Sequence, residues 1–267
     1  MRNVLKDWLV RANVHGSGNE IVFEEADRRR HIMFKTPQTF LKIRGNGNIV
    51  TIRSSVARSK TATGLPAGLS LTVRGNGNHV VLDGVRFVKS AITLVGDGCS
   101  FEIGPTADPI REASFWVADG GSVQIGKDFG PQERLKVVVD NDAEKKHRLV
   151  IGDGVLTAVD TVIRTSDGHS LVDPDTGLPV NEPDDVVIGN RVWIGTRSII
   201  LKGAVLADGC VVGANSLVNK KFTETGLLLV GSPARVLRRG VQWDERPYGT
   251  LLAQKRGDHA ANERSAQ

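Results

Sequence analysis

One histidine of the sequence lies in a segment whose residue types suit proton transfer. The segment reads Thr165-Ser-Asp-Gly-His-Ser170 and places His169 two residues after Asp167. Histidine changes charge near neutral pH, so it can act as a general base that takes the proton of an attacking hydroxyl group. A catalytic imidazole also needs its second ring nitrogen held, and either Asp167 or a backbone carbonyl could hold it. The alternative is that His169 is a polar residue capping a turn in a glycine-rich loop.

The chain around this segment repeats with a period of six residues. Branched aliphatic residues recur at this interval, and a small or β-branched residue follows four positions after each of the first five. The aliphatic positions are Ile188, Ile194, Ile200, Leu206, Val212 and Val218, and the small positions are Val192, Ser198, Ala204, Cys210 and Ser216. Neither a helical period nor strand alternation alone produces a strict six. The pattern predicts short strands joined by tight corners, three to a triangular coil of about 18 residues. A β-meander would need all these spacings to coincide by chance.

The upstream half repeats less regularly and predicts further coils of the same kind. Three similar segments, Val14–Asn19, Ile43–Asn48 and Val73–Asn78, recur at spacings of 29 and 30 residues, and alternating apolar residues follow each one. Their glycines and asparagines are typical of left-handed turn positions between short strands, whereas phosphate-binding nests would need a strand-to-helix context. We expect an all-β solenoid with irregular repeats over 1–135, regular hexapeptides over 136–222, and a basic segment with a polar tail over 223–267. The tail from residue 242 is expected to be a loose helix or disordered.

The six-residue period is interrupted between residues 167 and 185. Three prolines, Pro174, Pro179 and Pro183, together with Gly177, break the pattern there. Solenoid insertions of this kind map to loops on one face, often the face that binds ligands. The sequence therefore predicts a loop that projects from the solenoid and carries His169.

The composition excludes several classes of protein. The chain has 267 residues and a formal net charge of +5. Its two cysteines are too few for a disulfide scaffold, and no apolar stretch approaches the roughly 18 residues that a membrane-spanning helix needs. The charge suits an anionic ligand but is too small to argue for nucleic acid. The N-terminal residues have no apolar signal core, so we expect a cytoplasmic protein. The histidines lack the spacing of metal ligands, so we expect no catalytic metal.

Three motifs resemble a known family. Val192-Trp-Ile-Gly195, Val212-Gly-Ala-Asn-Ser216 and Gly231-Ser-Pro-Ala-Arg235 are similar to those of the left-handed β-helix, hexapeptide-repeat acetyltransferases. The nearest branch is the acetyl-CoA-dependent O-acetyltransferases, in which a catalytic histidine precedes the tryptophan by 24 positions, as His169 precedes Trp193 here. The long upstream region and the loop resemble the enzymes that acetylate bacterial capsules, sialic-acid polymers and lipopolysaccharide.

The resemblance implies a left-handed parallel β-helix, an acetyl-CoA cosubstrate, a carbohydrate acceptor and a homotrimer whose active sites lie between neighbouring copies. It implies that Trp193 lines the site near the thioester. Its alternative roles are packing under the 167–185 loop or a contact between subunits. Residues that match cofactor contacts of the family are Thr196, Ala214, Lys220, Arg235 and Arg238, with Lys202 as a further candidate. Asn219 stands where the family usually has threonine, which removes a common hydroxyl.

Alternative functions remain open at this stage. One is acetylation of a small acceptor, such as a simple sugar, an amino sugar or serine, although the Trp-Ile-Gly motif argues against serine. Another is a non-catalytic solenoid that presents a binding surface, against which the retained His169, Trp193 and Arg235 argue. The upstream half is expected to be scaffold, with acceptor binding or an extended trimer contact as its alternatives.

Overall fold

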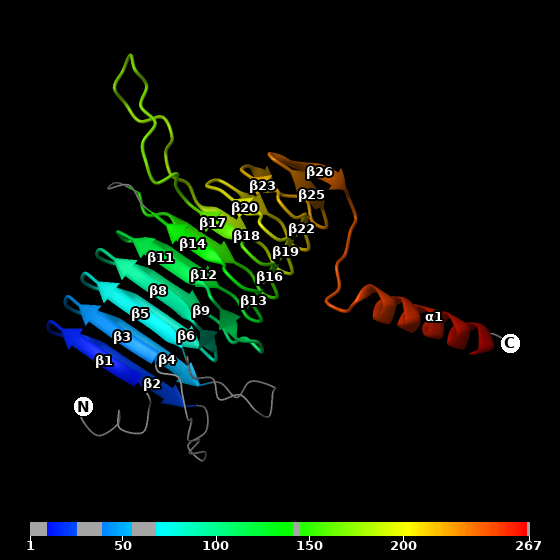
Figure 1. The fold of residues 1–267 in the computed structure, drawn as a ribbon, viewed down its shortest axis with the longest axis horizontal. Coiled ribbons are helices and arrows are strands. Elements are labelled where there is room, and N and C mark those ends of the chain that lie inside the picture. Colours follow the sequence, from blue (N-terminus) through cyan, green and yellow to red (C-terminus); the bar gives the residue numbers. More distant parts are fainter. Residues whose placement is uncertain (1–9, 26–38, 55–67, 141–144, 266–267) are drawn as a thin grey trace.

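The computed structural model describes residues 10–25, 39–54, 68–140 and 145–265. Most of their strands belong to three sheets that wrap around one core as a triangular prism, and all pairings in these sheets are parallel except that of the last strand (Figure 1). Sheet 1 has nine strands: β1 (Val10–His15), β3 (Thr39–Arg44), β5 (Leu69–Arg74), β8 (Ser90–Val95), β11 (Ser114–Ala118), β14 (Lys136–Val139), β17 (Val162–Arg164), β20 (Ile199–Ile200) and β23 (Leu217–Val218). The predicted left-handed parallel β-helix is confirmed.

The other two sheets complete each coil. Sheet 2 consists of β2 (Glu20–Glu25), β4 (Ile49–Ser54), β6 (His79–Asp83), β9 (Ser100–Ile103), β12 (Ser122–Ile125), β15 (Arg148–Ile151), β18 (Val186–Ile188), β21 (Val205–Leu206) and β24 (Lys221–Phe222). Sheet 3 consists of β13 (Gly130–Pro131), β16 (Leu156–Thr157), β19 (Trp193–Ile194), β22 (Val211–Val212), β25 (Leu228–Gly231) and β26 (Ala234–Arg238). A small separate pair, β7 (Phe87–Val88) and β10 (Ile110–Arg111), lies earlier in the chain. Each later coil therefore passes from sheet 1 to sheet 2 to sheet 3.

The hexapeptide pattern forms the core of the later coils. All six periodic aliphatic residues from Ile188 to Val218 are buried, and so are the five small residues at the corners. Side chains at equivalent positions stack from coil to coil, for example Ile194 on Val212. Cys210 occupies one of these corners and burial raises the pKa of its thiol, which fits the prediction of a small core residue.

The Gly-Asn segments form the corners between sheets 1 and 2 in the early coils. Their glycines have positive φ, as predicted, and a Cβ on Gly75 would lie 2.0 Å from the carbonyl oxygen of Gly96 in the next coil. The asparagines do not take left-handed conformations, which corrects that part of the expectation. They stack instead, because the buried Asn78 amide donates to Asn48 Oδ1 at 2.9 Å and Asn78 Oδ1 accepts from the Cys99 N–H at 2.7 Å.

The solenoid continues past the last regular hexapeptide. Lys221 and Phe222 leave the six-residue frame, yet β24 pairs with β21 and keeps Phe222 buried. The chain then forms β25, which pairs with β22, and turns back as the antiparallel β26. The tail ends in the helix α1 (Tyr248–Ser265), which extends away from the prism (Figure 1). In the part of the chain that the structure describes, no helix has the length and apolar character needed to cross a membrane.

Candidate active site

A projecting arm carries His169. The arm runs between β17 and β18 and extends well beyond the prism, as the sequence predicts (Figure 1). Its two sides are joined by the Asn181 side chain, which accepts from the Leu171 N–H and donates to the His169 carbonyl oxygen, both at 2.8 Å. The His169 side chain is exposed, and its imidazole makes no hydrogen bond to any described residue. The arm thus fixes the backbone of His169 and leaves its ring accessible.

The base of the arm is anchored by an ion pair. Lys202, in the turn between β20 and β21, donates to Asp167 Oδ2 at 2.7 Å and to the Asn181 carbonyl oxygen at 2.8 Å. The hydrogen bonds from Lys202 and then Asn181 lower the pKa of the Asp167 carboxyl, so this group is held ionised. The structure therefore brings Asp167 and Lys202 together, although the sequence analysis gave them different roles. The Asp167 carboxylate is engaged by Lys202 and Asn181 in this arrangement.

Trp193 lies on a different wall of the prism. It is the first residue of β19 in sheet 3, stacks between Leu156 and Val211 of the neighbouring coils, and has 40% of its surface exposed. Its ring lies 6.2 Å from that of Trp243, centroid to centroid. The 167–185 arm leaves from the corner between sheets 1 and 2, so in this chain the side chain that packs on Trp193 comes from the C-terminal segment instead.

Trp243 is a contact that the sequence analysis missed. Its indole N–H donates to the Arg191 carbonyl oxygen, and the Arg191 guanidinium lies 5.4 Å from the ring centroid. The sequence placed Trp243 in a polar tail without periodicity. The signal was its residue type, because an isolated tryptophan in a polar segment usually packs on something.

The remaining candidate residues divide between two edges of the prism. Thr196 and Ala214 lie in the corners that lead from sheet 3 to sheet 1, where the Asn215 N–H donates to the Thr196 carbonyl oxygen at 2.9 Å. Arg235 and Arg238 are exposed on β26, at the end of sheet 3. These four residues share a side of the molecule with Trp193.

The second group lies at the opposite edge of sheet 1. Asp167, His169 and Lys202 lie where the chain passes from sheet 1 to sheet 2, and so does Lys220, which stacks over the Phe222 ring at 5.3 Å. One side of a coil is six residues long in this region, or roughly 20 Å. A single chain therefore separates His169 from the group around Trp193.

Among the described residues, no group of three or more histidine, cysteine or acidic side chains gathers as metal ligands do. The titratable groups of the two edges are instead single side chains or ion pairs, such as Asp167 with Lys202.

Comparison with known proteins agrees with this architecture. Residues 185–220 match the family model described as bacterial transferase hexapeptide (six repeats). The chain is 29% identical over 196 residues to the polysialic acid O-acetyltransferase of Neisseria meningitidis, which covers 72% of this chain and 87% of that protein. It is 30% identical over 139 residues to the galactoside O-acetyltransferase of Escherichia coli (strain K12), covering 51% of this chain and 64% of the relative.

A solved structure shares the fold over nearly the whole chain. It is that of the polySia specific acetyltransferase NeuO, with a TM-score of 0.61 and 21% sequence identity, covering 95% of this chain and 98% of that one. At this identity the match concerns the fold alone. The hexapeptide repeats, the family model that matches them and the sequence relatives together support an acyltransferase of the hexapeptide-repeat type.

Proposed function

We propose that this protein transfers an acetyl group from acetyl-CoA to a hydroxyl group of a bacterial surface glycan. The observation that carries the proposal is the similarity to the polysialic acid O-acetyltransferase of Neisseria meningitidis, because it extends over 196 residues and so includes much more than the hexapeptide region. In this proposal residues 136–222 and the segment 223–267 carry the chemistry.

His169 is the general base of the proposed reaction. Its accessible imidazole takes the proton of the acceptor hydroxyl as that oxygen bonds to the acetyl carbonyl carbon. The carbon–sulfur bond then breaks, the acetyl ester remains on the glycan, and the coenzyme A thiolate leaves with the proton that the imidazole returns. The arm supports this role because Asn181 and the Asp167–Lys202 pair fix the backbone around His169 without using its ring.

The site is completed by a second copy of the chain in a homotrimer. His169 extends from one edge of sheet 1, while Trp193, Thr196 and Ala214 belong to sheet 3 and the opposite edge. A cyclic arrangement brings these unlike edges of neighbouring copies together at each interface. Three equivalent sites then form, each with the histidine of one copy and the tryptophan of the next.

Coenzyme A fits the sheet 3 side of this interface. Its pantetheine arm carries amide groups that suit the backbone of the corners at Thr196 and Ala214. Its phosphates need cations, which Arg235 and Arg238 supply from β26 at the end of the same side. Lys220, where the chain passes from sheet 1 to sheet 2, supplies a further positive charge to the interface from the copy that contributes His169. Lys202 is engaged by Asp167 and contributes through the arm that it anchors.

The test measures thiol release from acetyl-CoA by the wild-type protein and by His169→Ala, with acidic oligosaccharides and simple sugars as acceptors. We expect acceptor-dependent release, and a loss of about 10²–10⁴ in rate for His169→Ala, or about 3–5 kcal/mol of barrier. Ser170→Ala is the matched control, because it changes the neighbouring exposed residue of the arm. Full activity of His169→Ala would show that the histidine is not the general base. If the wild type released no thiol from acetyl-CoA with any acceptor, the proposed acetyl transfer would be wrong.

A second candidate acceptor is a small sugar. The similarity to galactoside O-acetyltransferase favours it, at 30% identity over 139 residues. The same set of acceptors separates the two candidates. If the enzyme is specific for a polymer, a simple sugar will be acetylated poorly when it is supplied at the concentration at which the oligosaccharide saturates the enzyme.

A further inference from the structure

The outer face of sheet 1 differs in charge from that of sheet 2. The strands of sheet 1 contain no aspartate or glutamate, whereas the strands of sheet 2 contain five acidic residues. The acidic residues are Glu20, Glu24, Glu25, Asp83 and Glu102, and the outward cations of sheet 1 are Lys42, Arg44, Arg74, Lys136 and Arg164. The described strands of this wall from β3 to β17 therefore contain cations and no carboxylates, and Arg164 at the end of β17 lies 3.9 Å from Asp140, which follows β14.

Two arginines on this wall lie directly beside each other. Arg44 of β3 is in register with Arg74 of β5, and both side chains are exposed. Neighbouring strands are about 4.8 Å apart, and like charges in register destabilise a sheet. Neither arginine forms an ion pair with a described residue, and the same holds for Lys42. An anionic ligand bound between Arg44 and Arg74 would remove this repulsion.

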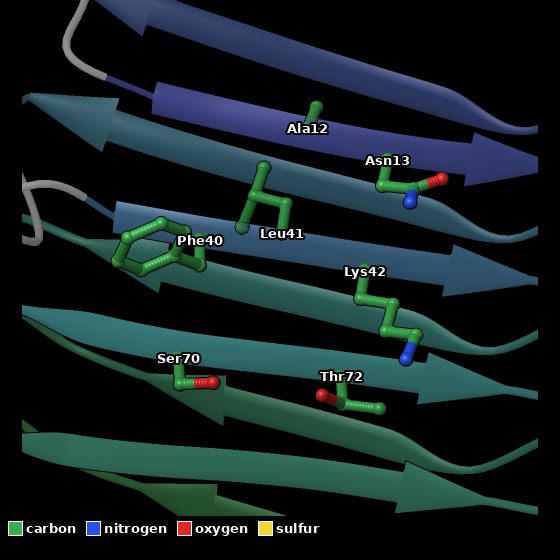
Figure 2. A pocket seen from close by; sticks show the side chains of 7 residues that line it. All are labelled: Ala12, Asn13, Phe40, Leu41, Lys42, Ser70 and Thr72. Atoms are coloured by element: carbon green, nitrogen blue, oxygen red, sulfur yellow. The ribbon is translucent and has the colours of Figure 1, made fainter.

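Polar and aromatic side chains accompany the cations. Figure 2 shows one row formed by Asn13, Lys42 and Thr72 across three strands, and beside it Phe40 and Ser70. Together with Ala12 and Leu41 these residues line a depression of about 310 Å³. Phe40 has 47% of its surface exposed, although it is a large apolar residue on a sheet face.

A second exposed aromatic residue lies further along the same face. Trp116 of β11 is 42% exposed, and its row continues through Thr93 of β8 to Thr72. Aromatic rings interleaved with hydroxyl groups match the chemistry of sugars, whose C–H faces pack on rings and whose hydroxyls exchange hydrogen bonds. The cations add a preference for carboxylate or phosphate groups on those sugars.

This wall leads to the arm that carries His169. Sheet 1 passes from β3 through β5, β8, β11 and β14 to β17, and the arm begins directly after β17. Five steps between strands span about 24 Å. A chain of several sugars can therefore lie across the strands with one end near the arm.

A second copy of this chain is the other conceivable occupant of the wall. In a cyclic trimer, three such walls facing one axis would bring together cations without carboxylates to balance them. The outward side chains of the later coils of sheet 1 are instead aliphatic, among them Val162, Ile199 and Leu217. These later coils suit contacts between copies, and the early coils do not.

We propose that the outer face of sheet 1 between β3 and β11 binds the extended chain of an acidic polysaccharide and so presents one of its sugars to His169. The proposal deepens the proposed function and rests on it for the identity of that chain as the acceptor. It assigns the upstream half of the protein a binding role, in place of a scaffold alone.

The experiment measures binding of long-chain polysialic acid, polygalacturonate and neutral dextran by calorimetry, without acetyl-CoA. We expect both acidic polymers to bind and dextran to bind more weakly. Arg44→Gln/Arg74→Gln should weaken acidic-polymer binding by at least about fivefold, and Trp116→Ala by about threefold or more. Arg111→Gln/Lys127→Gln is the matched control, because it removes the same charge from exposed positions outside sheet 1. Circular dichroism verifies that each variant is folded.

A transfer assay with a short acidic acceptor separates this proposal from the proposed function. For a disaccharide, kcat and KM of Arg44→Gln/Arg74→Gln should equal those of the wild type, while KM for the long polymer rises. Failure of the wild type to bind either acidic polymer, or equal binding by this variant and the control, overturns the binding face. If binding follows the predicted pattern but no acceptor is acetylated, the binding face stands and the proposed function fails.

Discussion

The rings of Trp193 and Trp243 lie 6.2 Å apart, and this contact joins the wall of sheet 3 to the C-terminal segment. Trp243 is also held by its N–H bond to the Arg191 carbonyl oxygen and by the Arg191 guanidinium above its ring. One residue thus fixes the path of the chain between β26 and α1 and covers part of the exposed indole.

Replacing Trp243 by alanine should loosen this segment and expose Trp193. We expect a red shift of the tryptophan emission, and a loss of about 1–2 kcal/mol of stability, because a ring pair and a hydrogen bond each contribute about 1 kcal/mol. Trp243→Phe is the control, since it keeps a ring there but lacks the N–H, and should lose about half as much. Equal stability of all three proteins in urea unfolding would contradict a structural role for the pair.

Mixed trimers test the completion of each site by two copies. His169→Ala and Trp193→Ala chains should each have low activity alone, because each lacks one side of every site. Co-expressed in equal amounts, they should recover about a quarter of the wild-type activity, since half of the sites have an intact histidine and half of these an intact tryptophan. If both residues acted within one chain, mixing would recover nothing.

The Asp167–Lys202 pair should hold the base of the arm above acidic pH. The pKa of Asp167 is lowered in the folded protein, so its contribution is complete above the ordinary value of about 3.9 and is lost as the pH falls through the lowered pKa. Both side chains are partly exposed, at 36% and 22%, so the pair contributes at most about 1 kcal/mol. Hydrogen exchange of residues 165–185 should be unchanged between pH 7 and about 5 after correction for intrinsic rates.

Lys202→Met should raise hydrogen exchange of residues 165–185 at neutral pH, because it removes the ion pair with Asp167. Protonation of Asp167 at strongly acidic pH should have the same effect in the wild type. Lys220→Met is the control, because it removes a lysine from the same edge that forms no ion pair with a described residue. Equal exchange in both variants would show that the anchor is unimportant for the arm.

The buried asparagine stack should be more important for stability than the exposed one beside it. Asn78→Ala leaves the Cys99 N–H without its partner in the core and removes one of the two N–H groups that donate to Asn48 Oδ1, which should cost about 1–3 kcal/mol. Asn76→Ala removes a similar bond, from the Asn46 N–H to Asn76 Oδ1 at 2.9 Å, but at an exposed position where water replaces it. Thermal unfolding of the two variants compares them directly, and equal midpoints would contradict the difference.

The fold was predictable from the sequence because its core is made by short-range periodicity. Each of the six periodic aliphatic residues from Ile188 to Val218 occupies the inward position that the six-residue pattern assigns to it. The arm was predictable because its three prolines and Gly177 interrupt the six-residue pattern between residues 167 and 185. The strand β24 was less evident from the sequence, because Phe222 follows the last periodic aliphatic residue, Val218, by four positions and not by six. Its place in the core depends on the pairing of β24 with β21.

The contacts of the candidate site were less predictable. The pairing of Asp167 with Lys202 joins residues 35 positions apart, through a turn and an arm that have no common period. The same is true of Trp243, which lies 52 positions from Arg191. Sequence spacing identifies which residues share a coil edge, but the paths of irregular segments depend on contacts that no repeat encodes.

The reversal of the chain into β26 determines which strands can pair with β25, the last parallel strand of sheet 3. A parallel solenoid ends in a strand whose unpaired backbone groups can template another coil, or another molecule, in the same direction. Because β26 runs antiparallel to β25, it occupies that edge with a strand of opposite polarity. The hairpin therefore covers the edge of β25 that a further parallel coil of sheet 3 would use, and its removal would expose that edge.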